Sequence, residues 1–347
     1  MKSWLVFFCS LIILSACSRK RNYPVITTYA GNGKMGTADG LKENASFANP
    51  MAIAADKKRN LYVADSRNNM IRKIDALGNV TNLAGSGVVG SQDGAGTNAS
   101  FFYPMGIAVD DSGNVFVGDT HNDLIRKITA DGMVSTVAGR RLTASPLNVD
   151  SNDVKFDNPV GIAIDHEGNL YIADMMNDVI RKIGYDKKIT NLAGNISDAG
   201  FANGKAPSSS FYLPWGIAVD SSNNIYVSDS YNNMIRKITR DGNVTTFAGH
   251  LQKGSSDGKD TAASFFHPAG IALDGKGNLY VADMGNNKIR KISPDGIVTT
   301  VAGNGSRGNH DDRDTLSTFN KPYGVTISND CIYVTDYQNN LIRKISF

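Results

Sequence analysis

The chain has 347 residues, of which 41% are hydrophobic and 20% charged, a composition that excludes extended disorder. Its formal net charge of +3 is too small for this length to argue for a nucleic-acid partner. The first 24 residues differ from the rest and are considered first.

Residues 1–16 have the pattern of a secretion signal. Lys2 precedes the apolar run 4–14, which is too short to cross a bilayer. The next residues complete the tetrapeptide LSAC at 14–17, which resembles the lipobox of bacterial lipoproteins. The resemblance implies that Cys17 is acylated and anchors the protein through its lipid chains. We therefore expect a protein of the bacterial cell envelope, anchored in the outer membrane and facing the periplasm.

Residues 17–24 are predicted to form a lipidated tether. Seven residues separate Cys17 from the first predicted strand and reach about 25 Å at most when extended, so the folded body should lie close to the membrane. Cys331 is the one cysteine of the sequence outside the signal and the lipobox, and we expect it to pack within the fold.

From residue 25 the chain repeats one unit. The tetrapeptide Ile-Arg-Lys-Ile occurs six times at a spacing of 53 to 55 residues. Its arginines are Arg72, Arg126, Arg181, Arg236, Arg290 and Arg343. Each unit holds four short runs rich in β-branched and aromatic residues, bounded by Gly, Asn, Asp and Pro. In the second unit these runs are 106–110, 115–119, 124–128 and 134–139. The pattern predicts six four-stranded antiparallel sheets.

Six sheets at constant spacing favour an all-β, six-bladed β-propeller over a sandwich or a solenoid. Residues 26–31 copy the fourth strand of the unit, whereas the last unit stops at Phe347 after three strands. We therefore predict one domain over residues 25–347, in which 26–31 pairs with 341–346 and closes the last blade. This closure removes two free sheet edges.

The repeated motifs P-x-G-I-A-V-D, G-N-L-Y-V-A-D, N-N-x-I-R-K-I and V-T-T-x-A-G resemble the NHL repeat. The resemblance covers residues 25–347 and is closest to NHL proteins of the bacterial envelope. It implies the propeller fold. Function does not follow, because NHL propellers serve as RNA binders, protein-interaction modules, receptor sensor domains and, in one branch, a metal-dependent lyase.

Two repeated patterns are interpreted as architecture. The G-x-G-x-x-G pattern at 31–36 recurs at the same point of other units and no helical pattern follows it, so we interpret it as a turn between blades and not as a dinucleotide site. An aspartate at the end of each second strand is expected to pair with the arginine of its unit. These aspartates are Asp65, Asp119, Asp174, Asp229, Asp283 and Asp336.

A binding site is expected where the copies disagree. In related propellers the loop entering the first strand and the loop joining strands two and three share one face, and both loops vary here. The candidate ligand-binding residues on this face are Arg67, Tyr103, His121, Met176, Trp215, Tyr231, His267 and Tyr323. Aromatic, thioether and imidazole groups suit an amphiphilic or peptide-like ligand better than a phosphate. The alternative is a scaffold whose lateral faces bind a protein partner.

Catalysis is the other class of function. In the lyase branch, histidines from several blades hold zinc on this face, and here only His121 and His267 occupy its loops, whereas His166 lies in a hairpin turn. Two histidines make an incomplete zinc site, although a lactonase-type carboxylate site is a further alternative. We predict no catalytic residue, resident metal, cofactor or nucleic-acid partner, and a monomer whose partners are the membrane and a protein or peptide.

Overall fold

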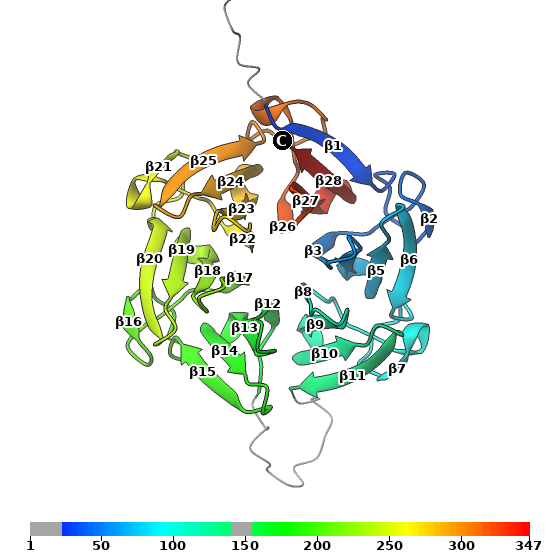
Figure 1. Cartoon of the computed structure of the whole chain (residues 1–347), viewed down its shortest axis with the longest axis horizontal. Coiled ribbons are helices and arrows are strands. Elements are labelled where there is room, and N and C mark those ends of the chain that lie inside the picture. Colours follow the sequence, from blue (N-terminus) through cyan, green and yellow to red (C-terminus); the bar gives the residue numbers. More distant parts are fainter. Residues whose placement is uncertain (1–22, 140–154, 197) are drawn as a thin grey trace, which may run out of the picture.

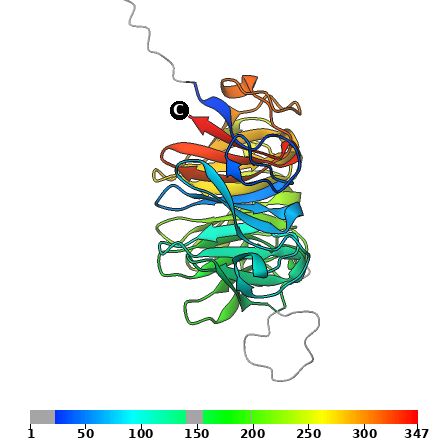
Figure 2. The same ribbon diagram turned by 90° about the vertical axis from the view of Figure 1, so that its right-hand side faces the viewer.

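The computed structural model describes residues 23–139, 155–196 and 198–347. They form six antiparallel sheets of four or five strands, arranged as blades around a central axis, so the predicted propeller is confirmed (Figure 1). Seen from the side, the molecule is a disc (Figure 2). The predicted signal at 1–16 and the acylation at Cys17 lie outside the described residues. Among the described residues, no helix is both long and apolar enough to cross a membrane.

The first three blades are given from the axis outwards. The first contains β3 (Pro50–Ala55), β4 (Leu61–Asp65), β5 (Met70–Ile74), β6 (Asn79–Ala84) and β2 (Gly40–Leu41). The second contains β8 (Gly106–Val109), β9 (Val115–Asp119), β10 (Leu124–Ile128), β11 (Met133–Ala138) and β7 (Gly94–Ala95). The third contains β12 (Pro159–Ile164), β13 (Leu170–Asp174), β14 (Val179–Ile183) and β15 (Ile189–Ala193).

The other three blades repeat this order. The fourth contains β17 (Pro214–Val219), β18 (Ile225–Asp229), β19 (Met234–Ile238), β20 (Asn243–Gly249) and β16 (Gly204–Lys205). The fifth contains β22 (Pro268–Leu273), β23 (Leu279–Asp283), β24 (Lys288–Ile292), β25 (Ile297–Ala302) and β21 (Gly258–Lys259). The sixth contains β26 (Pro322–Ser328), β27 (Cys331–Asp336), β28 (Leu341–Ser346) and β1 (Val25–Ala30).

Short 3-10 turns join strands two and three of each blade and also occur between blades. The turns that join strands are η1 (Ser66–Asn68), η3 (Thr120–Asn122), η4 (Met175–Asn177), η5 (Ser230–Asn232), η7 (Met284–Asn286) and η9 (Tyr337–Asn339). Those between blades are η2 (Gly96–Asn98), η6 (Asp260–Ala262) and η8 (Asp314–Leu316).

The ring closes as predicted. β1 pairs antiparallel with β28, with Val25 opposite Ser346 and Thr28 opposite Arg343. Ile26 is buried in the core between the fifth and sixth blades. The two ends of the described chain therefore complete one blade, and β1 covers the edge that β28 would otherwise expose.

The hydrophobic core lies between neighbouring blades. One cluster, for example, joins Tyr62 and Ala64 of the first blade to Ile107 and Val117 of the second. Blades approach most closely at the axis, where the glycine of the P-x-G motif leaves room for the next inner strand. A Cβ at Gly324 would lie 2.6 Å from the backbone oxygen of Met51, closer than packed atoms allow. Glycine avoids this contact in five of the six units, whereas the first unit has Ala52 at this position.

The predicted aspartate–arginine pairs form in all six blades, at N–O distances of 2.7 to 3.0 Å. In the fourth blade Arg236 donates to Asp229 at 2.7 Å and to the backbone oxygens of Ser210 and Ala202, while its guanidinium lies 5.3 Å from the ring centroid of Phe211. Asp229 also accepts the N–H of Tyr212. Each pair thus ties two strands to the segment that arrives from the preceding blade.

Candidate ligand-binding face

Strand register places the two variable loops at the same end of each blade. Pro50, at the start of β3, lies opposite Asp65, at the end of β4, and four other blades have equivalent pairs. The loop that enters an inner strand is therefore beside the 3-10 turn that follows the second strand. The hairpin turns between strands one and two and between strands three and four lie at the opposite ends of the strands.

The residue before each loop proline has a left-handed backbone, with φ between 48° and 54°. Tyr103 and His267 adopt this conformation at φ 51° and 48°, which is unusual for bulky side chains. Their N–H groups donate to the side-chain oxygens of Asn69 and Asn233, each from the preceding blade, at 2.9 and 3.0 Å. The preceding blade thus determines the direction in which these side chains leave the loop.

In five of the blades the residue after the loop proline lies at the mouth of the central channel. Met51, Met105, Val160, Trp215 and Tyr323 line a small cavity of about 60 Å³ there. The channel mouth is therefore apolar and nearly filled. A ligand would rest on it rather than enter it.

Aromatic rings continue outward from this mouth in one connected series. The ring centroids of Trp215 and Tyr323 are 5.4 Å apart, and those of Tyr323 and Tyr337 are 5.0 Å apart. The hydroxyl oxygens of Tyr337 and Tyr103 are 3.4 Å apart, and Tyr103 stacks on His121 at 5.1 Å with an interplanar angle of 11°. Three blades, the second, the fourth and the sixth, contribute to this series, so the fold brings together residues distant in sequence.

A second group lies between the fourth and fifth blades. The ring of His267 is 4.6 Å from that of Tyr231 and 4.5 Å from that of Phe266. Tyr212 packs against Tyr231 at 5.2 Å. We call the two groups together the aromatic face; it comprises Tyr103, His121, Tyr212, Trp215, Tyr231, Phe266, His267, Tyr323 and Tyr337.

Burial sets the charge of this face. It lowers the pKa of His121 and of His267 below 6.5, and Nδ1 of His267 is buried without a hydrogen-bond partner. Burial also raises the pKa of Tyr323 to about 12. Burial also raises the pKa of Tyr103, so both histidines, Tyr103 and Tyr323 are neutral at pH 7.

The remaining predicted residues take different positions. Arg67 lies near Tyr103 at the edge of the face, with its Nη1 3.6 Å from the sulfur of Met35. Met176 is 47% exposed in η4. Arg67 is thus at the periphery of the face, and Met176 is an exposed side chain of the third blade.

Sequence reasoning missed Tyr337, which connects the two halves of the first series. It occupies the position after the conserved aspartate of the unit, where the other units have Ser66, Thr120, Met175, Ser230 and Met284. Those side chains are small or unbranched, so the position looked structural. Tyr337 differs from the residues at this position in the other units. A comparison of the six units at this position would therefore have identified it.

The possible metal ligands do not converge among the described residues. No group of three or more His, Cys, Asp or Glu side chains there could hold a metal ion. His121 packs in the second blade and His267 at the fifth, each in its own aromatic surroundings. No observation on the described residues thus favours the metal-assisted alternative.

Comparison with known proteins identifies the repeat. The NHL repeat family matches residues 211–238. The chain is 30% identical over 286 residues to Protein SUPPRESSOR OF QUENCHING 1, chloroplastic, of Arabidopsis thaliana, covering 77% of this chain and 27% of that protein. It is also 30% identical over 335 residues to NHL repeat-containing protein 2 of Bos taurus, covering 85% and 46%. The chain thus spans less than half the length of these relatives.

Solved structures share the architecture at low identity. An auxiliary nutrient binding protein from Bacteroides thetaiotaomicron aligns with a TM-score of 0.72 at 19% identity, covering 93% of this chain and 76% of that one. Virginiamycin B lyase from Staphylococcus aureus aligns with a TM-score of 0.58 at 15% identity, covering 93% and 99%. With its repeats and its six blades, the chain is an NHL-repeat β-propeller.

Proposed function

We propose that this chain is a membrane-anchored binding module of the bacterial cell envelope whose aromatic face binds a small, uncharged amphiphilic ligand. The observation that carries the proposal is the connected series from Trp215 to His121, which is apolar at the channel mouth and bears tyrosine hydroxyls further out. Rings supply contact area at little cost in side-chain entropy, and hydroxyls orient a ligand.

The neutral state of the face argues against phosphate or nucleic acid as the ligand. Such ligands are recognised by clustered Arg and Lys side chains, whereas here Arg67 lies at the edge and Lys253 is placed over the ring of Phe266. The nutrient-binding role of a protein with the same fold is compatible with a small-molecule ligand. Because that likeness is at 19% identity, the proposal depends on the residues of this chain.

The position of Trp215 makes the proposal testable by fluorescence. The sequence contains two tryptophans, and the other, Trp4, belongs to the predicted signal. A chain beginning at residue 18 therefore reports only on Trp215. We expect its emission to shift when neutral oligosaccharides or uncharged peptides from a panel bind at the face.

The matched experiment replaces Trp215, Tyr231 and Tyr323 together by alanine and measures binding by calorimetry. We expect the affinity to fall by about 100-fold, since each ring of a well-packed site contributes about 1 kcal/mol or more. Phe201→Ala is the control, because Phe201 is an exposed aromatic residue outside the face. Retained binding in the triple variant would place the ligand elsewhere.

The anchor is tested separately. Wild type expressed with residues 1–17 should incorporate labelled palmitate and sediment with membranes, whereas Cys17→Ser should do neither. Equal membrane attachment of both would refute the lipid anchor and leave the binding proposal intact.

A further inference from the structure

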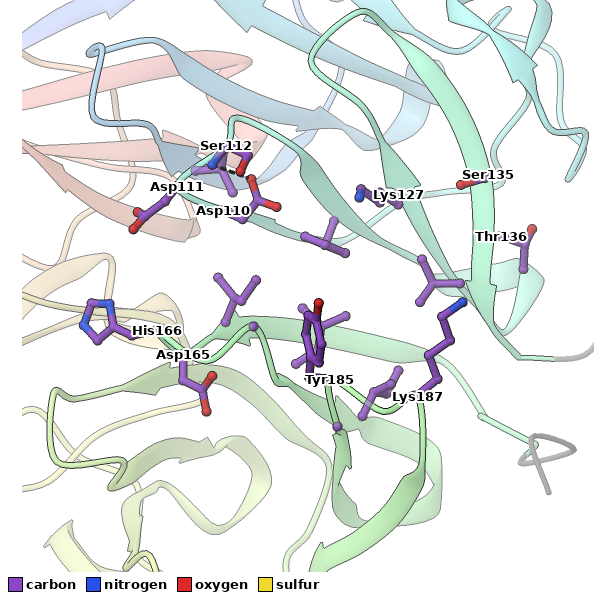
Figure 3. A pocket seen from close by; sticks show the side chains of 18 residues that line it. Asp110, Asp111, Ser112, Lys127, Ser135, Thr136, Asp165, His166, Tyr185 and Lys187 are labelled. Carbon is purple, nitrogen blue, oxygen red and sulfur yellow. Dashed lines mark hydrogen bonds between the residues drawn. The ribbon is translucent and has the colours of Figure 1, made fainter.

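A cleft of about 600 Å³ opens between the second and third blades (Figure 3). It is lined by the hairpin turns at 110–112 and 165–168 and by the turn at 184–187, so it lies on the face of the disc opposite the aromatic face. The equivalent cleft between the first and second blades measures about 190 Å³. The larger cleft falls within the range of small-molecule sites.

The repeat is interrupted at this cleft by three substitutions. Phe116 replaces the tyrosine that the other units carry as Tyr62, Tyr171, Tyr226, Tyr280 and Tyr333. Lys187 replaces the glycine found as Gly78, Gly132, Gly242 and Gly296. Gly184 replaces a side chain that is Asp75, Thr129, Thr239 or Ser293 elsewhere. All three departures line one cavity, as expected of a site and not of the common framework.

The first substitution, Phe116, leaves the carboxylate of Asp110 able to accept a further hydrogen bond. Asp110 accepts the N–H groups of Ser112 and Asn114 at Oδ1 and the side-chain amide of Asn114 at Oδ2. In the first and third units a tyrosine hydroxyl also donates to the equivalent Oδ2, at 3.1 and 3.0 Å. Phe116 has no hydroxyl, so Oδ2 of Asp110 keeps a free lone pair at the cleft.

The second departure adds a cation. Lys187 has φ 65°, in the left-handed region where the other units use glycine, and its side chain lines the cleft. Lys127 also lines the cleft, with its ammonium 5.8 Å from the ring centroid of Phe116. Within the described part of the chain neither lysine forms an ion pair with a carboxylate. Two ammonium groups are therefore available to an anion.

The charges are separated along the cleft. Figure 3 shows Asp110, Asp111, Asp165 and His166 toward one end and Lys127 and Lys187 toward the other. Between them lie apolar side chains and a tyrosine, namely Val109, Phe116, Val137, Ile164, Leu170, Ile183 and Tyr185. Asp111 is already paired with Lys57 at 2.8 Å, which leaves Asp110 as the acceptor with free capacity.

We propose that this cleft binds a short apolar peptide with free termini. Its ammonium group donates to Asp110, its carboxylate accepts from Lys127 and Lys187, and its side chains pack on Phe116 and Val137. A zwitterion with an apolar middle is the ligand that complements such a charge distribution. This site is separate from the aromatic face and does not depend on its proposed function.

The test uses the tripeptide Ala-Leu-Ala with free termini, titrated into the chain beginning at residue 18 by calorimetry. We expect binding that weakens by about 10-fold when the amino group is acetylated and again when the carboxylate is amidated, since each change removes a charge-assisted hydrogen bond. No binding, or equal binding of the blocked peptides, would overturn the proposal.

Two variants restore the residue of the repeat and so should fold. Phe116→Tyr supplies a hydroxyl that donates to Asp110. Lys187→Gly removes the ammonium group and relieves the left-handed backbone. Each variant should bind the tripeptide with an affinity lower by about 5-fold or more, without a lower Tm. Tyr226→Phe, the reverse change in the fourth blade, is the control. Unchanged affinity in both variants, or loss of binding in Trp215→Ala instead, would refute the site.

Discussion

Removal of one buried arginine should destabilise the whole ring. Arg236 and Asp229 have fully buried side chains, and Arg236 also donates to Asn203 at 2.9 Å and to backbone oxygens of the segment from the third blade. In Arg236→Met the carboxyl loses its cation while it keeps the N–H of Tyr212 and the amide of Asn232. Breaking one partner of a buried pair costs about 3 to 5 kcal/mol.

For a domain of this size, that cost should lower Tm by roughly 5 to 10 °C. Urea unfolding followed by circular dichroism should show a matching fall in the midpoint. Lys205→Ala is the control, because Lys205 pairs with Asp241 at 3.0 Å on the surface and surface pairs contribute about 1 kcal/mol or less. An Arg236→Met midpoint equal to that of wild type would show that the pair does not hold the blades together.

The stability lost in Arg236→Met should also increase with pH. Burial raises the pKa of Asp229 to about 6 in the folded protein, above its ordinary value of 3.8, even with Arg236 in place. When the pKa of a carboxyl is higher in the folded than in the unfolded protein, the free energy of unfolding falls as the pH rises from the unfolded pKa to the folded pKa. Without Arg236 this range extends upward, so the deficit of Arg236→Met relative to wild type should grow between pH 6 and pH 8.

Three other changes probe separate parts of the molecule. Gly324→Ala should cost about 1 to 3 kcal/mol by urea unfolding because its Cβ meets backbone of the next blade, whereas Gly275→Ala, with open space around it, should be neutral. Deletion of residues 25–31 exposes an edge of β28 and should lower Tm clearly; an unchanged Tm would contradict the closure. The pKa values of His121 and His267 are lowered by burial, so their contribution to stability should be lost as the pH falls through about 6.5, and replacing both by Gln should flatten the decrease in Tm between pH 7 and pH 5.

Most of the fold could be predicted because the sequence contains six copies of the same unit. The four strands of a unit, the aspartate–arginine pairs and the closure by residues 26–31 all follow from in-register copies, and the structure has each of them. Among the described residues, four of these arginines also pair with a second aspartate, and this contact was not predicted. Arg72, for example, also binds Asp39 at 2.5 Å, 33 residues earlier, and that contact depends on the path of the segment between blades.

The site was less predictable because the sequence shows which residues vary but not which of them are in contact. The variable positions identified Tyr103, Trp215 and Tyr323 as residues of one face, yet their contacts depend on which blades meet across the axis. The cleft beside Phe116 was missed because the criterion was applied to one face only. A substitution such as tyrosine to phenylalanine is conservative in the core, and its effect on Asp110 becomes visible only with the hydrogen bonds.

Both candidate sites use a left-handed backbone position to present a large side chain. Tyr103 has φ 51° where the first and third units use Asn49 and Asn158, and Lys187 has φ 65° where other units use glycine. Asn tolerates this conformation better than tyrosine, at a difference of about 1 kcal/mol. Tyr103→Asn should therefore raise the urea midpoint while it removes the stack on His121 and weakens ligand binding at the aromatic face. A Tyr103→Asn protein less stable than wild type would mean that the ring contacts outweigh the backbone strain, and that this face serves packing more than binding.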